Sequence, residues 1–511
     1  MDRRAFLGIA AKLGVSPWVL PATTVWARGL KTGSYFGLHP FIEAHPEAVF
    51  IRKTNATSKD DSEGKRRAGL HLAQRIFALQ DSPGIPLSHK FVIKPNLTST
   101  VGTGTTYAIV TDSEVVEGII EGMKELGIPA ERIYIREGLM PTQPGTGYIE
   151  MAERTGVHYG DADARTAVAK ECPDGVVFRR TKFVGPFSYP DSYLINIAKL
   201  KTHSMGLTLC VKNLQGTNIR PYIRFCGGLQ PDIAEDFQPD AQRHVDDLYE
   251  KHLQAGYPRW DTAKGAYMEM WAQRTMDSYS LVRSTLGLNI IEGMVAQNGD
   301  GFAKGPGPGV TPEVFLTNAL IFGKDAFRVD IVGHWLGGHE PGNFGMFHIA
   351  RERGLSTALD PRNIPIYVWE DDGPKLTPLD RLTRTPLTTP YLPLPGESEY
   401  HLCNEPFDYP QEPVSACLSG QAKPELRVLG RHHRGRQGPQ ALIEYSLPHD
   451  GNACVEVYDA FGERVGVLAR GQHSRGIHMA AWEASGVSPG VYFSRLRTQG
   501  YDHVQRLAVL G

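Results

Sequence analysis

The chain has 511 residues, which is too long for a single hydrophobic core and predicts two or more domains. Hydrophobic residues make up 41% and charged residues 22%, the mixture of an ordinary globular protein. The formal net charge of -2 gives no overall attraction to nucleic acid or to an anionic membrane surface. No apolar run after the N-terminal segment is long enough to span a bilayer, so we expect no nucleic-acid partner and no membrane span there.

The N-terminal segment has the pattern of a targeting signal. Arg3 and Arg4 precede Phe6 and a mostly apolar stretch, which ends in small residues at Ala27. This pattern resembles the twin-arginine export signal, and Lys12 within the apolar stretch favours that route over general secretion. We therefore expect a signal peptide at 1–27, recognition of Arg3 and Arg4 by export machinery, and a periplasmic, cell-surface or extracellular location. The alternative is an ordinary amphipathic helix.

The six cysteines show no C-x-x-C pair and no clustering. Iron–sulfur and zinc sites normally need clustered ligands, so we expect no iron–sulfur cluster, and the cofactor stays unknown. Cys403 and Cys417 could close a short loop if oxidised, and buried free thiols are the alternative for the others.

Strands and helices alternate along the first two thirds of the chain. Apolar spacing predicts helices at 65–80, 113–126, 147–156, 241–253, 263–276 and 326–336. Short apolar runs predict strands at 91–93, 132–135, 193–198, 286–291 and 318–322. This order is typical of an α/β domain with a mainly parallel sheet, which we place at 28–373.

The composition changes after residue 373. Frequent prolines predict a linker over 374–438, and the basic run at 431–436 is either solvated linker or a weak polyanion-binding patch. Alternating apolar residues then predict strands at 441–447, 454–458, 464–468, 476–482, 491–496 and 503–509. We expect a small all-β, immunoglobulin-like sandwich at 439–511.

Polar side chains gather at the predicted strand ends. They belong to Lys94, Glu137, Lys199, Asp300 and Asp325. In open parallel sheets, ligands bind outside the carboxyl ends of the strands, so we expect one shared site that takes a small anionic ligand. Lysine suits phosphate or carboxylate, and histidine moves protons near neutral pH.

We assign roles to these and neighbouring residues on the chemistry of their side chains. The candidate catalytic residues are Lys199, His203 and Lys212. The candidate ligand-binding residues are Lys94, Asn96, Lys201, Asn213 and Asp300. The metal is unknown, and its candidate ligands are Asp112, Glu137 and Asp325, with helix capping as the alternative for Asp112.

Several motifs resemble the family catalogued as domain of unknown function 362. They are Lys94-Pro95-Asn96-Leu97, Thr111-Asp112, Ile197-Ala198-Lys199-Leu200-Lys201-Thr202-His203, Lys212-Asn213 with Gly216, and Ile291-Glu292-Gly293-Met294 with Gly299-Asp300-Gly301. The resemblance covers about 90–355 and implies no settled activity. Many members of the family carry a ferredoxin-type iron–sulfur module, for which this chain lacks the cysteines. The block from His203 to Lys212 also faintly resembles lactate racemase-type proteins, in which a lysine anchors a nickel-pincer nucleotide, although the spacing differs.

The last seventy or so residues resemble the sandwich domain that ends many proteins exported by type IX secretion, which is related to flagellar hook-capping domains. The matching segments are Ile443-Glu444-Tyr445-Ser446-Leu447-Pro448, Val457-Tyr458-Asp459-Ala460-Phe461-Gly462 and Ser488-Pro489-Gly490-Val491-Tyr492-Phe493. The resemblance implies sorting or surface attachment. Three hypotheses follow: an exported enzyme or cofactor-dependent protein, a non-catalytic binder of an anionic molecule, and a surface-anchored scaffold whose lysines are structural.

Overall fold

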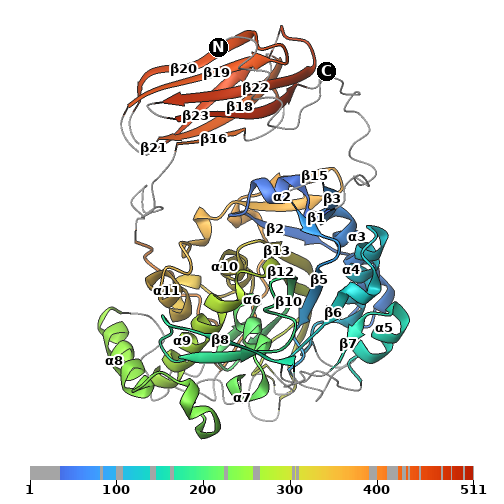
Figure 1. Cartoon of the computed structure of the whole chain (residues 1–511), viewed down its shortest axis with the longest axis vertical. Coiled ribbons are helices and arrows are strands. Elements are labelled where there is room, and N and C mark those ends of the chain that lie inside the picture. Colours follow the sequence, from blue (N-terminus) through green and yellow to red (C-terminus); the bar gives the residue numbers. More distant parts are fainter. Residues whose placement is uncertain are drawn as a thin grey trace. The chain divides into compact units, whose positions relative to one another are not determined.

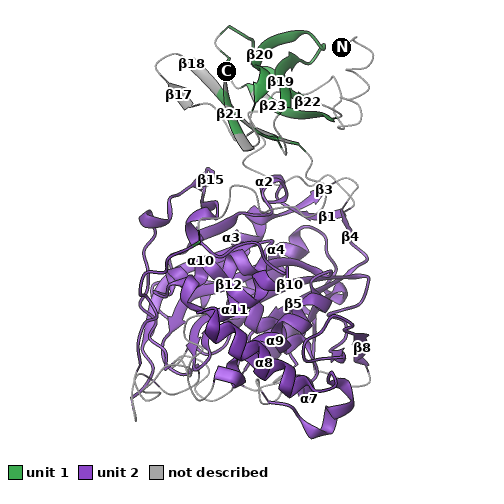
Figure 2. Ribbon diagram, turned by 90° about the vertical axis from the view of Figure 1, so that its left-hand side faces the viewer, with its two compact units in different colours: residues 1–23, 410–511 green, residues 24–409 purple. Residues whose placement is uncertain are grey.

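The chain contains two compact units, one within Thr24–Tyr409 and another that includes the chain from Pro410 onward (Figures 1 and 2). The computed structural model describes residues 35–80, 84–98, 108–138, 145–160, 166–223, 228–256, 265–301, Gly305, 310–390, 400–410, 424–428, 433–435, 438–447, 451–473, 476–484, 486–498 and 501–509. The predicted signal peptide lies outside these residues. Within them, no helix combines the length and the apolar character that a membrane crossing requires.

A ten-stranded mixed sheet forms the centre of the first unit, here called the α/β unit. Its main path runs in the order β15-β14-β2-β13-β12-β10-β5-β6-β7, and β11 pairs with β10. The strands are β2 (Val49–Lys53), β5 (Lys90–Pro95), β6 (Ile133–Ile135), β7 (His158–Tyr159), β10 (Ser192–His203), β11 (Gly206–Thr208), β12 (Leu286–Gln297), β13 (Val314–Gly323), β14 (Ile366–Glu370) and β15 (Gly373–Leu376). The five strands from β12 to β7 run parallel, which confirms the predicted α/β core.

Helices cover both faces of this sheet (Figure 1). The α-helices are α2 (Pro40–Ala44), α3 (Ser62–Ile76), α4 (Ser113–Glu125), α5 (Tyr148–Thr155), α6 (Cys210–Asn213), α7 (Arg220–Ile223), α8 (Ala241–Gln254), α9 (Gly265–Val282), α10 (Ala326–Leu336) and α11 (Gly345–Glu352). Helices α3, α4 and α5 share one hydrophobic core, while α6, α9, α10 and α11 share the core on the other face. Because side chains alternate along a strand, β10 places Ile195 and Ile197 in the first core and Leu194 and Ala198 in the second.

Smaller elements complete the α/β unit. Strand β1 (Tyr35–Leu38) lies between β3 (Phe77–Gln80) and β4 (Ile85–Pro86), and β8 (Val168–Glu171) pairs with β9 (Arg180–Phe183). The 3-10 helices are η2 (Ala130–Arg132), η4 (Leu214–Thr217), η5 (Pro231–Asp236), η6 (Pro341–Asn343), η7 (Pro361–Asn363) and η8 (Leu379–Arg381).

Several predictions about the α/β unit are wrong in their boundaries, and three of them bear on the site. The helix predicted at 65–80 ends at Ile76, because the next four residues form β3 against β1. The strand predicted at 193–198 continues to His203, so Lys199 and Lys201 lie within β10 and not in a loop. The linker predicted from residue 374 also starts too early. Residues 374–376 belong to β15, and Leu387 and Cys403 are buried in the core that contains α10.

The loop at Asp325 lies beside the amino ends of the parallel strands, whereas the other predicted site loops lie at their carboxyl ends. Strand β13 runs antiparallel to β12, so its end at Gly323 lies beside the start of the parallel strands. The Asp325 carboxylate accepts hydrogen bonds from the backbone N–H groups of Phe327 (2.9 Å) and Arg328 (3.1 Å) and thereby caps α10. The prediction that Asp325 joins the shared site is therefore wrong.

The C-terminal unit consists of two antiparallel four-stranded sheets. One contains β16 (Glu425–Val428), β17 (His433–Gly435), β18 (Gly438–Leu447) and β21 (Gly476–Glu483); the other has the order β20 (Arg464–His473), β19 (Gly451–Asp459), β22 (Gly490–Thr498) and β23 (Tyr501–Val509). Both sheets contribute buried residues to one core, which includes Ile443, Val455 and Leu496. The predicted C-terminal β-sandwich is confirmed, and β16 and β17 lie in the segment predicted as linker.

Candidate functional site

Lys94 lies at the end of β5 in a fully buried polar network. Its ammonium group donates to Glu137 Oε2 (2.6 Å), to the carbonyl oxygen of Pro95 (2.9 Å) and to Asn213 Oδ1 (3.1 Å). Asn96 Nδ2 also donates to Asn213 Oδ1 (3.1 Å), and Asn213 Nδ2 donates to Asn196 Oδ1 (2.8 Å). We call the five residues whose side chains are joined in this way the Lys94 network: Lys94, Asn96, Glu137, Asn196 and Asn213. Burial lowers the pKa of Lys94 despite the nearby Glu137 carboxylate.

Two long-range contacts position this network. Gly216 lies against the Lys94–Glu137 ion pair so closely that a Cβ atom there would fall 2.1 Å from Glu137 Oε1 and 2.7 Å from Lys94 Nζ. Asp330 of α10 accepts hydrogen bonds from the backbone N–H groups of Cys210 (2.7 Å) and Val211 (2.8 Å) and thereby fixes the start of α6. Because α6 carries Lys212 and Asn213, Asp330 is a positioning residue for both of them.

A second buried network surrounds Lys199 on the opposite face of the sheet. Lys199 Nζ donates to Glu292 Oε2 of the neighbouring strand β12 and to Asp112 Oδ2 (3.2 Å). Lys65 of α3 lies 3.1 Å from the same Asp112 oxygen. We call these four residues the Lys199 network. Burial alone would lower the pKa of Lys199, but the carboxylates of Asp112 and Glu292 raise it. Lys199 is therefore charged, and the two carboxylates compensate its positive charge.

The end of β10 is tied to the turn that follows β12. Lys201 Nζ donates to the carbonyl oxygen of Gly301 (3.0 Å) and to Thr98 Oγ1 (3.0 Å), both of which are neutral oxygens. Thr202 Oγ1 donates to the carbonyl oxygen of Gly299 (2.7 Å). Gly301 has a φ of +92°, a conformation that favours glycine, and a Cβ atom there would lie 2.6 Å from His203 Cδ2. The turn thus requires glycine where it meets His203.

Three basic residues converge at this strand end: Lys201, His203 and Lys212, here called the Lys201 group. Burial, followed by the charges of Lys212 and Lys199, lowers the pKa of Lys201 well below its ordinary value, and Asp300 and Glu137 compensate only in part. Burial, Lys212 and Lys201 likewise lower the pKa of His203 well below its ordinary value. The local potential is therefore positive, even though the net charge of the chain is close to zero.

His203 has a defined orientation. Its Nδ1 accepts a hydrogen bond from the backbone N–H of Met205 (3.2 Å), and the Ser204 hydroxyl lies 3.3 Å from the same nitrogen. In a neutral imidazole this arrangement places the proton on Nε2. Because the pKa of His203 is lowered, the neutral ring with an Nε2–H donor is the form expected at pH 7.

Part of the segment predicted as linker contributes to the surroundings of this site. Thr389 is fully buried, and its hydroxyl donates to the carbonyl oxygen of His203 (2.6 Å). The backbone N–H of Gly299 donates to the carbonyl oxygen of Thr388 (3.0 Å). The charge of Asp300 contributes to a raised pKa of Tyr400, after burial, so Tyr400 lies near the same turn.

The predicted site residues therefore separate into three sets. Lys94, Asn96, Glu137 and Asn213 form one buried network, and Lys199 and Asp112 belong to another. Lys201, His203, Lys212 and Asp300 gather at the end of β10. Asp112 occupies the N-cap position of α4, but its side chain contacts Lys65 and Lys199 and makes no capping hydrogen bond. Among the described residues, no three His, Cys, Asp or Glu side chains lie together in a way that could hold a metal ion.

Sequence reasoning missed several residues that shape these networks. Lys65, Thr98, Glu292 and Thr389 all contact a predicted site residue. Glu292 could have been found, because parallel pairing of the strands predicted at 193–198 and 286–291 brings Lys199 beside it. Lys65 and Thr389 lie far from the site in sequence, and no local pattern marks them.

Comparison with known proteins identifies one domain. The sequence model of the family described as "Domain of unknown function (DUF362)" matches residues 91–334. A comparison with curated proteins finds no match to the chain. The matched segment contains the parallel strands from β5 to β12 and most of the residues of the three sets described above. Residues 91–334 of the α/β unit are therefore a DUF362 domain.

Proposed function

We propose that the DUF362 domain binds a small anionic molecule at the Lys201 group. The observation that carries this proposal is the convergence of Lys201, His203 and Lys212 at the end of β10, where the charge of Lys212 helps to lower the pKa of both neighbours. A phosphate or carboxylate would relieve this repulsion and would accept hydrogen bonds from ammonium groups and from the His203 Nε2–H. The negative charge of the ligand would offset the free-energy cost of burying the Lys201 ammonium group.

The other two predicted lysines have a different role in this proposal. Lys94 and Lys199 each contact buried carboxylates, so their charges are already compensated within the fold. Breaking such a buried pair is costly, and a ligand that competed with the carboxylate would have to supply that free energy. We therefore assign Lys94 and Lys199 to positioning the strand ends, with Asn96 and Asn213 as their hydrogen-bonding partners.

A second candidate function is proton transfer to or from the bound anion. A lysine whose pKa is lowered has a larger fraction of free amine, which can act as a base or a nucleophile. The neutral His203 beside it can stabilise developing negative charge by donating a hydrogen bond from Nε2. These two groups give the same site the chemistry of an enzyme, whereas binding alone requires only their charge and hydrogen bonds.

The test is binding of inorganic phosphate, oxalate and citrate to the full chain, measured as thermal stabilisation at constant ionic strength, with chloride as the reference anion. A ligand that binds the folded state raises the unfolding temperature as its concentration rises. Lys201→Met should remove most of this stabilisation. Lys53→Met is the matched control, because Lys53 is an exposed residue of the same unit. Equal stabilisation of the wild type and Lys201→Met would reject the proposal and favour the scaffold hypothesis.

We also retain the proposal that the protein is exported and that the C-terminal sandwich serves sorting or surface attachment. It is supported by the twin-arginine pattern at Arg3 and Arg4 and by the β-sandwich at the other end of the chain. Replacing both arginines by lysine should leave the protein in the cytoplasm in a fractionation experiment. Unchanged export would remove the twin-arginine assignment without affecting the proposal for the Lys201 group.

A further inference from the structure

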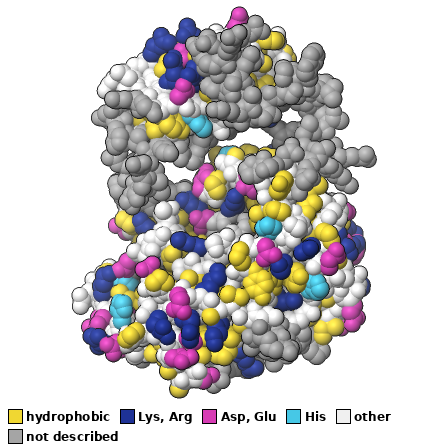
Figure 3. Space-filling view, in the orientation of Figure 1, with side chains coloured by type: hydrophobic (Ala, Val, Ile, Leu, Met, Phe, Trp, Pro, Cys, Tyr) yellow, Lys and Arg dark blue, Asp and Glu magenta, His cyan; other side chains and the backbone are white. Residues whose placement is uncertain are grey.

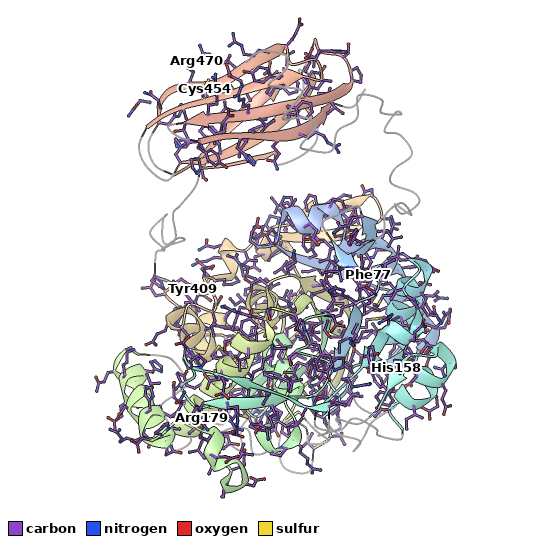
Figure 4. All side chains as sticks on the ribbon, in the orientation of Figure 1. Phe77, His158, Arg179, Tyr409, Cys454 and Arg470 are labelled. Carbon is purple, nitrogen blue, oxygen red and sulfur yellow. The ribbon has the colours of Figure 1, made fainter. Side chains whose placement is uncertain are left out.

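An open cavity of about 500 Å³ lies on the outer face of the sheet formed by β20, β19, β22 and β23. Its lining includes Cys454 of β19, Arg470 and Gly471 of β20, and Arg497 and Thr498 of β22. Figure 4 shows Cys454 and Arg470 together on the C-terminal unit. A cavity of this size is in the range that small-molecule ligands occupy. None of these residues belongs to the DUF362 domain, so the cavity is independent of the Lys201 group.

Strand pairing places two arginines on either side of Cys454. Cys454 pairs with Arg470 across β19 and β20 and with Arg497 across β19 and β22. Residues directly opposite each other on paired strands point to the same face, so all three side chains lie on the outer face. Val455, the next residue along β19, lies in the core instead. The Arg470 and Arg497 side chains are 61% and 44% exposed, which leaves them accessible to a ligand.

A buried carboxylate fixes these arginines. Glu456 Oε2 accepts a hydrogen bond from Arg497 Nη2 (2.7 Å), and Glu456 Oε1 accepts from Arg470 Nη2 (3.2 Å) and from Arg464 Nη1 (3.0 Å). Burial would raise the pKa of Glu456, but hydrogen bonds from Tyr458 and Arg464 and the charge of Arg497 lower it to about 2. Glu456 thus contacts three guanidinium groups. The nearby Asp502 forms an ion pair with a fourth, Arg495, so a positive excess remains on this face.

This arrangement has the features of an oxyanion-binding site. Arg470 of β20 and Arg497 of β22 flank the central strand β19 and share one carboxylate, Glu456, between them. Each guanidinium has five N–H donors; Arg470 and Arg497 each use one on Glu456, and both also hydrogen-bond to Cys454. These hydrogen bonds restrain both arginine side chains beside the cavity, so a ligand would have to immobilise them less on binding. Figure 3 shows Lys and Arg side chains gathered on the visible surface of the sandwich.

We propose that this cavity binds a small soluble molecule through a carboxylate or phosphate group held between Arg470 and Arg497. The guanidinium fork matches both groups and can form paired hydrogen bonds with either. Asn452, two residues before Cys454 on β19 and therefore on the same face, lines the same cavity and offers neutral hydrogen-bonding groups to the rest of the molecule. Cys454 forms part of the lining, so an occupant shields its sulfur.

The Cys454 thiol provides a local readout of occupancy. The full chain is treated with iodoacetamide, and alkylation of the Cys454 peptide is followed by mass spectrometry at rising concentrations of citrate or inorganic phosphate. Chloride at equal ionic strength is the reference. The buried Cys172, Cys210 and Cys403 report on unfolding of the α/β unit, and hydrogen exchange of the peptide with the buried Val455 reports on unfolding of the sandwich. We expect saturable slowing of Cys454 alkylation by citrate, by phosphate, or by both.

Variants distinguish anion binding in the cavity from a non-specific effect of charge on Cys454 alkylation. In Arg470→Gln with Arg497→Gln, the citrate concentration that gives half protection should rise at least about ten-fold, since each charge-assisted hydrogen bond can contribute that factor. Arg464→Gln is the matched control, because Arg464 contacts the same Glu456 but does not line the cavity, and it should keep the protection. If hydrogen exchange shows that the sandwich of the double variant is unfolded, the single Arg470→Gln variant replaces it. The proposal is overturned if neither anion protects Cys454, if chloride protects equally, or if protection survives loss of the cavity arginines.

Discussion

Lys201 Nζ donates a 3.0 Å hydrogen bond to the carbonyl oxygen of Gly301, which fastens the end of β10 to the turn after β12. These two residues are 100 positions apart in the chain, and β10 and β12 run parallel at the centre of the sheet. The bond places Lys201 and His203 beside Asp300, whose charge contributes to the raised pKa of Tyr400. The proposed anion site therefore depends on a turn whose backbone only glycine adopts without strain.

Gly301→Ala tests the dependence on this turn. A side chain at φ +92° is strained by about 1–2 kcal/mol, and its Cβ would also meet His203. We expect a loss of about 1–3 kcal/mol in the free energy of unfolding, measured in urea, together with weaker phosphate or citrate binding. Gly160→Ala is the control, because a Cβ at Gly160 meets no atom within 4 Å. Unchanged stability and binding in Gly301→Ala would show that the turn does not position the site.

Lys94→Met and Lys201→Met should differ in their effect on stability. Lys94→Met leaves Glu137 buried without its cation, which costs about 3–5 kcal/mol. Lys201→Met removes a cation whose charged form is already disfavoured by burial and by neighbouring lysines, so its cost should be smaller. Urea unfolding of both variants at pH 7 measures this difference. Equal losses in the free energy of unfolding would mean that the charge of Lys201 is compensated within the fold as strongly as that of Lys94.

Lys199 and Glu292 should be strongly coupled. Lys199→Met alone leaves two carboxylates near each other in the interior, with an expected loss of about 3–5 kcal/mol. Adding Glu292→Gln removes one of these charges and keeps an acceptor for the backbone N–H of Met294. The double variant should therefore be more stable than Lys199→Met. Losses that simply add would contradict a direct pairing.

Asp330 should make stability depend on pH. Burial raises the pKa of Asp330 to about 7, whereas an aspartate in the unfolded chain titrates near its ordinary value of about 4. Between these values the folded state holds a proton that the unfolded state has lost. The contribution of Asp330 to the free energy of unfolding is therefore largest below about pH 4. It declines as the pH rises to about 7, by at most about 4 kcal/mol.

Asp330→Asn removes this titration. Its stability relative to the wild type should improve as the pH rises from about 4 to about 7, as measured by urea unfolding across that range. A constant difference between the two proteins would contradict the raised pKa. The single oxygen of asparagine can accept from Cys210 or Val211 but cannot satisfy both separately, so a constant loss adds to the difference without changing its slope.

The sequence predicts the architecture better than it predicts the site. Alternating apolar residues located β10 and the six sandwich strands from β18 to β23, and helical spacing located α4, α5 and α10, because burial imposes those periods. The extension of β10 through Lys199 and Lys201 was not predictable from local pattern, since buried lysines need partners that lie elsewhere in the chain. Glu292 lies 93 residues beyond Lys199, and Glu137 lies 43 residues beyond Lys94.

The error at Asp325 has a similar cause. A strand's direction relative to its neighbour is set by the connection and the packing of the whole sheet, and the apolar run at 318–322 is the same for either direction. The linker prediction failed because prolines mark irregular backbone, and irregular backbone can still be packed, as at Leu387 and Thr389.

The most direct test of the anion site is anomalous diffraction from crystals of the full chain soaked in selenate. We predict a selenium peak within hydrogen-bonding distance of Lys201 Nζ, with His203 or Lys212 as a second contact, and no peak there in Lys201→Met crystals. Selenate that never occupies the end of β10, or that occupies it equally in Lys201→Met, would contradict the proposed function.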